Sequence, residues 1–109
     1  MATPSVPEPV ASFIAQVNDH DEQAFLAAFG ADGTVDDWGR IFTGPQEIKA
    51  WSDKEFLGAN GTLAVETVDQ VDGQIIVVGD WRSTHANGRS SFTFEVDGDR
   101  IATMIIREG

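Results

Sequence analysis

The chain has 109 residues, and 18 acidic side chains against 7 basic ones give it a net charge of −11 at pH 7. This charge argues against nucleic acid and anionic membrane surfaces as partners, because phosphate groups would be repelled. Cysteine is absent, which excludes disulfides and thiolate chemistry. No apolar run reaches membrane-spanning length and no signal-peptide pattern is present, so the expected location is the cytoplasm. The length predicts a single domain over residues 1–109.

The first 30 residues have the pattern of two helices. Apolar residues recur at helical spacing from Val10 to Val17, which predicts a first helix that ends near Asn18 or Asp19. Asp21 is placed to cap a second, short helix. Gly30 is expected to stop that helix, and residues 31–33 are expected to form a turn.

The segment Gly33–Gly39 predicts a short strand. Side chains alternate between the two faces of a strand, so Val35 and Asp37 share one face. If Val35 faces the core, Asp37 also points inward, where a carboxylate needs a partner, a wet cavity or a chemical role. The alternative interpretation has Val35 outward, Asp37 in solvent and Trp38 in the core.

A third helix is expected to begin after this strand. Thr43 or Gly44 caps it, and Gln46 or Glu47 is placed to close a capping box. Glu55 falls on the same face as Trp51, in the last turn, where solvation of its carboxylate is the simplest expectation.

The second half of the chain predicts strands only. Short turn signals such as Asp72-Gly73 and Asn87-Gly88 separate the segments, so strands that are neighbours in sequence should pair. The expected result is a four-stranded antiparallel meander with strands at residues 62–71, 74–86, 89–96 and 100–107. A strongly twisted sheet covered by helices on its concave face forms a cone, and the mouth of a cone suits a small molecule.

Two sets of chemical groups alternate on the long predicted strand 74–86. Trp81 and His85 share their parity with the apolar residues Ile75 and Val77, so an inward face would carry His85. The alternative is that His85 is exposed beside the Asn87-Gly88 turn. Asp80 and Arg82 have the other parity, which predicts a cross-strand ion pair on the surface.

The order of helix, helix, strand, helix and strand meander resembles the nuclear transport factor 2-like superfamily, in its SnoaL-like and ketosteroid-isomerase-like branch. The resemblance extends over nearly the whole chain, and it implies an α+β, cone-shaped (cystatin-like) fold with three N-terminal helices packed on a curved antiparallel sheet. The segments that carry it are residues 13–21, 24–25, 29, 33–37, 43–48, 92–94 and 97–98.

The resemblance also implies roles for individual residues. Asp37 stands where ketosteroid isomerases have an aspartate as general base. Phe13 and Phe92 stand where that family has a tyrosine and a protonated aspartic acid as oxyanion donors, so steroid isomerisation by that route is not expected. Dehydratases and cyclases of the superfamily use aspartate and histidine, which makes Asp37 and His85 the candidate acid and base.

Epoxide hydrolases of the superfamily use an Asp-Arg-Asp arrangement to activate water. Asp37, Arg82 and Asp80 supply these residue types. On a regular strand, however, Arg82 and His85 cannot both face inward, unless a β-bulge changes the parity.

The sequence thus predicts an isomerase, cyclase or dehydratase that acts on an apolar or cyclic small molecule, with Asp37 and His85 as catalytic residues. A non-catalytic ligand-binding protein and a dimerisation module with a filled cone are the alternatives. No cofactor and no metal site are expected, since two separated histidines without cysteine make a poor ligand set. A homodimer is expected through the convex sheet face, with Thr93, Glu95, Thr103 and Ile105 outward. The expected pocket residues are Phe13, Val17, Trp38, Trp51, Glu55, Trp81, Phe92, Phe94 and Met104.

Overall fold

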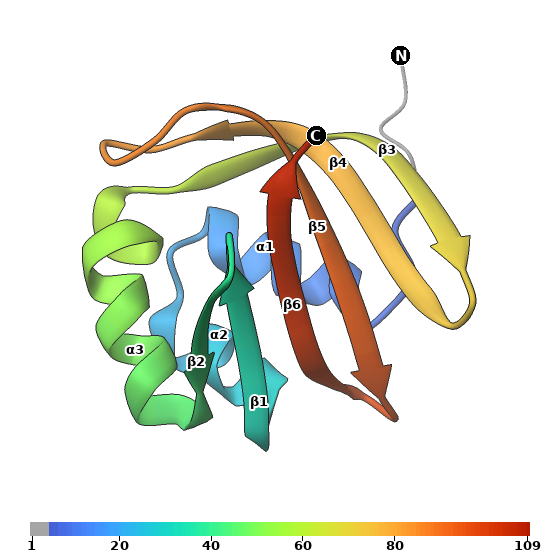
Figure 1. The fold of residues 1–109 in the computed structure, drawn as a ribbon, viewed down its shortest axis with the longest axis horizontal. Helices are drawn as coiled ribbons and strands as arrows, with labels where there is room; N and C mark the ends of the chain where they lie inside the picture. The colour runs from blue at the N-terminus through green and yellow to red at the C-terminus, as the bar shows by residue number, and fades with distance from the viewer. Residues whose placement is uncertain (1–4) are drawn as a thin grey trace.

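The computed structural model of the chain describes residues 5–109. Three helices lie against one face of a curved six-stranded sheet (Figure 1). No helix in these residues is long and apolar enough to cross a membrane. In chain order the elements are α1 (Val10–Asn18), α2 (Glu22–Ala28), β1 (Phe29–Asp37), β2 (Arg40–Thr43), α3 (Gly44–Glu55), a 3-10 turn (Leu57–Ala59), β3 (Thr62–Val71), β4 (Gln74–Arg82), β5 (Gly88–Asp97) and β6 (Arg100–Glu108).

The sheet has the order β2-β1-β6-β5-β4-β3. The predicted meander of β3 to β6 is confirmed, and all its pairs are antiparallel. β1 joins the sheet beside β6 in the one parallel pair, which sets Asp37 level with Ile106. The hairpin β1–β2 therefore forms the edge of the sheet next to α3, where the sheet and the helices approach each other (Figure 1).

The helix boundaries follow from local hydrogen bonds. The Asp21 carboxylate accepts a hydrogen bond from the Ala24 backbone N–H at 3.1 Å, which confirms the predicted cap of α2. At α3 the Glu47 carboxylate accepts from the Thr43 backbone N–H at 2.9 Å, as in half of a capping box. The 3-10 turn after α3 then leads the chain into β3.

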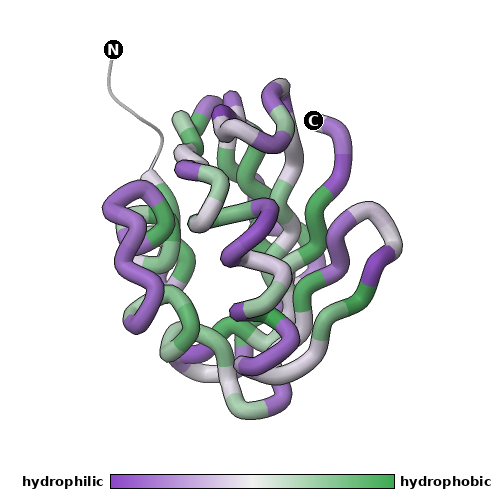
Figure 2. The backbone as a smooth tube through the Cα atoms, turned by 90° about the vertical axis from the view of Figure 1, so that its left-hand side faces the viewer, coloured by the Kyte–Doolittle hydropathy of each residue, from purple (hydrophilic) through white to green (hydrophobic). Residues whose placement is uncertain are grey.

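The core lies between the helices and the concave face of the sheet. Figure 2, with α3 toward the viewer, shows hydrophilic and hydrophobic residues alternating along this helix as it crosses in front of the sheet. The ring of Phe13 lies 5.4 Å from those of Phe25 and Phe29 and 5.6 Å from that of Phe94, between ring centres. These four rings from α1, α2, β1 and β5 fill the closed end of the cone.

The structure differs from the predicted elements in three places. Gly30 does not stop α2, because the chain is already extended at Phe29, and residues 31–33 belong to an irregular part of β1. β2, which pairs with β1 across the turn Trp38-Gly39, was not predicted. The long strand ends at Arg82 instead of Ala86.

The early end of β4 has a local cause. The Ser83 hydroxyl donates to the Ala86 carbonyl at 2.8 Å, and the Ser83 N–H donates to the Asn87 side chain at 2.9 Å. These bonds satisfy the backbone within a loop and compete with the strand ladder. The Thr84 N–H donates to the Ala59 carbonyl at 2.8 Å, which fixes the loop to the 3-10 turn after α3.

Candidate functional site

A cavity of about 340 Å³ opens at the wide end of the cone. The tip of the β1–β2 hairpin, the last turn of α3 and the loop after β4 surround it. Its wall combines charged groups with aromatic rings. The residues that line it are Asp37, Trp38, Arg40, Trp51, Glu55, Phe56, Trp81, His85, Ala86, Ser90, Phe92 and Ile106.

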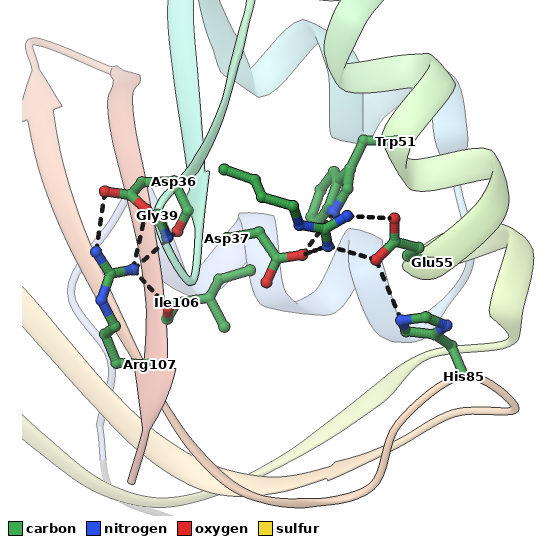
Figure 3. Close-up of polar contacts among 9 residues, drawn as sticks. Asp36, Asp37, Gly39, Trp51, Glu55, His85, Ile106 and Arg107 are labelled. Carbon is green, nitrogen blue, oxygen red and sulfur yellow. Dashed lines mark hydrogen bonds and ion pairs between the residues drawn. The ribbon is translucent and has the colours of Figure 1, made fainter.

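Asp37 lies in the wall of this cavity. Val35 is fully buried, and the side chain of Asp37, two residues on, is only 13% exposed, so the inward interpretation of the strand describes the structure. The indole N–H of Trp51 donates to Asp37 Oδ2 at 3.0 Å (Figure 3). The Arg40 guanidinium donates to the same oxygen. Within residues 5–109 no hydrogen bond is made to Oδ1. One carboxylate oxygen is therefore anchored by two donors, and the other has no hydrogen-bond donor among the described residues.

Arg40 joins two carboxylates. Its guanidinium donates to Glu55 Oε1 at 2.5 Å and to Glu55 Oε2 at 3.0 Å, in addition to its bond with Asp37. The hairpin creates this contact, because Asp37 and Arg40 are directly opposed in the β1–β2 register. Hydrogen bonds from Arg40 lower the pKa of Glu55, and Glu55 in turn raises the pKa of Arg40. Glu55 is therefore an ionised carboxylate at neutral pH.

His85 completes the polar side of the cavity. Its Nε2 lies 3.1 Å from Glu55 Oε1, as Figure 3 shows. The contact is an ion pair when the imidazole is protonated, and the carboxylate can only accept hydrogen bonds.

The apolar wall is a column of stacked rings. The ring of Phe42 stacks on Trp51 with 5.9 Å between centres, Trp51 on Phe56 with 4.8 Å, and Phe56 on Trp81 with 4.5 Å. Gly61 makes room for the last ring, because a Cβ at this position would lie 2.2 Å from Trp81 Cζ2. Trp51, Phe56 and Trp81 of this column are buried and close the apolar side of the cavity.

The structure divides the predicted pocket residues into two groups. Trp38, Trp51, Glu55, Trp81 and Phe92 line the cavity together with the two candidate catalytic residues. The other four predicted residues lie deeper, around a space of about 10 Å³, which at most fits one water molecule. These four are Phe13, Val17, Phe94 and Met104.

Asp80 and Arg82 do not take part in the site. They form an exposed ion pair on the other face of β4, with Arg82 Nε 2.8 Å from Asp80 Oδ2. The surface pair was expected across two strands and instead lies along one strand. The carboxylate–guanidinium–carboxylate arrangement, for which Asp37, Arg82 and Asp80 supply the residue types, is formed instead by Asp37, Arg40 and Glu55.

Arg40 is the charged residue of the site that was not predicted from the sequence. Its signal was present, because Thr34–Asp37 and Arg40–Thr43 flank a two-residue Trp-Gly segment, which is the spacing of a tight hairpin. Such a hairpin places Asp37 opposite Arg40. Within residues 5–109 no group of three acidic, histidine or cysteine side chains is arranged to hold a metal ion.

The comparisons with known proteins were made on sequence and on structure. No protein-family model and no curated protein matches the chain. A candidate polyketide cyclase from Sinorhizobium meliloti superposes with a TM-score of 0.81 at 19% identity, over 94% of this chain and 95% of that one. A protein from Mycobacterium tuberculosis in complex with estradiol-17β-hemisuccinate gives a TM-score of 0.79 at 19% identity, with 96% and 95% covered.

A third similar structure is described by its fold. It is a protein from Catenulispora acidiphila with a ketosteroid isomerase-like fold in complex with trimethylamine, with a TM-score of 0.75 at 19% identity over 96% of this chain and 88% of that one. Other neighbours are described as a nuclear transport factor 2-like protein and a cystatin-fold protein. The chain therefore has the cone-shaped nuclear transport factor 2-like fold, in the form seen in ketosteroid-isomerase-like proteins, and the fold expected from the sequence resemblance is confirmed.

Proposed function

We propose that the protein is an isomerase, cyclase or dehydratase that moves a proton on an apolar or cyclic small molecule. Asp37 is the general base. The observation that supports this role is that only one of its two carboxylate oxygens accepts hydrogen bonds: Oδ2 has two donors, and Oδ1 has none from residues 5–109. The donors hold the carboxylate against the cavity wall, and the free oxygen accepts the proton of a bound molecule.

His85 is the acid of this proposal. When Asp37 removes a proton from a C–H bond beside a carbonyl, the electron pair moves toward the carbonyl oxygen, which then takes a proton from the protonated imidazole of His85. The Glu55 carboxylate lies 3.1 Å from Nε2 of the same ring and positions it at the cavity. This donor substitutes for the oxyanion donors that Phe13 and Phe92 cannot provide.

The expected ligand follows from the wall of the cavity. Stacked rings of Trp51, Phe56 and Trp81 favour a flat or fused-ring body. Estradiol-17β-hemisuccinate in the mycobacterial neighbour is such a molecule, which supports this ligand class.

A thermal-shift screen with cyclic ketones, epoxides and polyketide fragments tests the proposal. A compound that raises the melting temperature is then assayed for turnover with the wild type, Asp37→Asn and the control Asp80→Asn. We expect Asp37→Asn to lower the rate by about 100-fold or more, which is the typical contribution of a general base. Equal turnover by wild type and Asp37→Asn contradicts the assigned role.

A non-catalytic binding function is the second candidate. The observation in its favour is that Phe92 lines the cavity at the position of an oxyanion donor, so no acid from β5 stabilises an enolate there. In that case compounds bind in the screen, and none of them is converted.

The proposed assembly is a homodimer that buries the convex face of the sheet. Thr93 and Ile105 are paired neighbours on β5 and β6, half-buried, on the face opposite the core residues. A second copy of the chain placed on this face leaves the cavity open to ligand.

A further inference from the structure

Trp38 occupies a position in the backbone that disfavours it. Trp38 and Gly39 have φ angles of 54° and 91°, so both central residues of the β1–β2 hairpin are left-handed, as in a type I′ turn. Asparagine, aspartate and glycine are favoured at the first position, whereas a bulky side chain there is strained. The β3–β4 hairpin of the same chain has the favoured pair, with Asp72 and Gly73 at 50° and 79°.

A set of hydrogen bonds holds this turn in place. The Asp36 carboxylate accepts from the Gly39 backbone N–H at 2.8 Å and from the Arg107 guanidinium at 3.0 and 3.1 Å. The Trp38 N–H donates to the Ile106 carbonyl at 3.2 Å. These contacts tie the hairpin tip to β6, as Figure 3 shows for Asp36, Gly39 and Arg107. The surrounding structure thus maintains the strained residue, which points to a use for its side chain.

The indole of Trp38 lies at the boundary of two hollows. Trp38 is 61% exposed, which is more than any other large apolar residue in residues 5–109. It lines the cavity that holds Asp37 and also an adjoining open groove of about 380 Å³, which continues along the start of β5. Trp81, Ala86 and Ser90 border both hollows as well. A molecule longer than the cavity would leave it through this boundary.

We propose that Trp38 is a specificity-determining residue that binds the outer part of an elongated, fused-ring ligand. The inner ring lies beside Asp37, the body of the ligand packs against the indole of Trp38, and a polar end enters the groove beside Asn87 and Arg89. This inference rests on the proposed function, since it requires that the cavity binds an apolar molecule. An indole covers more ring surface than any residue favoured in this turn, which accounts for tryptophan at a strained position.

The test combines binding and stability in one variant, Trp38→Asn. The probe is N-phenyl-1-naphthylamine, an uncharged aromatic dye whose fluorescence rises in apolar sites. We expect Trp38→Asn to weaken dye binding by about tenfold, because stacking and burial of one ring are worth roughly that factor. We expect the same variant to melt several degrees higher than the wild type, because asparagine relieves the left-handed strain.

Two further variants complete the experiment. Trp38→Phe should restore most of the affinity, and Asp72→Asn, in the matched turn, should change neither affinity nor melting temperature appreciably. Equal dye affinity of the wild type and Trp38→Asn overturns the role of Trp38 and leaves that of Asp37 standing. A melting temperature of Trp38→Asn at or below that of the wild type overturns the strain argument. If the dye does not bind the wild type, this inference and the ligand cavity of the proposed function are both overturned.

Discussion

Arg40 is the residue on which the polar side of the cavity depends. Asp37 and Glu55, 13% and 18% exposed, both face its guanidinium, which is itself half exposed. Without a cation between them, two partly desolvated carboxylates would repel each other. The exposure of Arg40 allows solvent to screen part of this attraction, so the contribution to stability is smaller than for a buried pair.

Replacing Arg40 by glutamine should therefore destabilise the fold. We expect the free energy of unfolding in urea to fall by about 1–2 kcal/mol at neutral pH, because one partner of a shared ion pair is removed. The matched control is Arg82→Gln, which breaks only the exposed pair with Asp80 and should have a much smaller effect on the free energy of unfolding. Equal losses in the two variants would show that the Arg40 cluster has no special role.

Glu55 should make stability depend on pH in acid solution. Hydrogen bonds from Arg40 lower its pKa in the folded state, so the folded protein binds its proton less readily than the unfolded chain. The stabilisation is present above the unfolded pKa of about 4.3 and is lost as pH falls through the lowered value. Urea unfolding at neutral pH and below pH 4 should show a smaller acid loss for Glu55→Gln than for the wild type. Glu66→Gln, in the exposed pair with Arg89, serves as the control, and an equal effect there would refute the assignment.

At the scale of elements, the β1–β2 hairpin explains both the success and the failure of prediction from sequence. Strand parity placed Val35 and Asp37 on one face, and the structure agrees, because alternation is a local property of any strand. The hairpin itself was missed because tryptophan stands where asparagine normally signals the turn. His85 reaches the cavity through a loop fixed to the 3-10 turn, a tertiary contact that strand parity does not contain.

The 3-10 turn and β3 also set the position of the aromatic wall. Gly61 lies against the ring of Trp81, where a Cβ would come within 2.2 Å. We expect Gly61→Ala to displace this ring from Phe56 and to lower the free energy of unfolding by about 1–3 kcal/mol, as overpacking does. Gly30→Ala is the control, because nothing lies within 4 Å of a Cβ there. Tryptophan fluorescence and urea unfolding check both variants, and similar values for both would contradict the assigned packing.

At the scale of the whole molecule, charge and fold were predictable and chemistry was not. Composition and the order of elements were enough for the cone, since short connections leave few ways to arrange a meander with three helices. The same cone supports many reactions, so its site must be argued from side chains. The bridge from Asp37 through Arg40 to Glu55 joins residues of three elements, and only the folded chain brings it together.

The net charge of −11 should make the fold salt-dependent. Added sodium chloride screens repulsion among 18 acidic groups and also weakens the ion pairs that 7 basic groups can form. Because unpaired acidic groups outnumber the pairs, we expect the melting temperature to rise with salt. A fall in melting temperature between low and about physiological ionic strength would mean that the ion pairs outweigh the repulsion.

The proposed dimer is tested by Ile105→Asp. A charge on the convex face should convert a dimer to a monomer in sedimentation velocity, because an unpaired carboxylate would be buried between the two copies. Thr67→Asp, on β3 at the margin of the sheet, is the control. A wild type that sediments as a monomer at all concentrations would contradict the proposed assembly.

Hydrogen exchange on a simple carbon acid tests the central claim most directly, because it needs no knowledge of the natural substrate. β-Tetralone is a fused-ring ketone with acidic hydrogens beside its carbonyl, and NMR in deuterated buffer follows their replacement by deuterium. If Asp37 Oδ1 is a general base in an aromatic cavity, the wild type and Asp80→Asn should accelerate this exchange above the buffer rate, and Asp37→Asn should not. Exchange at the buffer rate with the wild type, or equal acceleration by Asp37→Asn, would contradict the account.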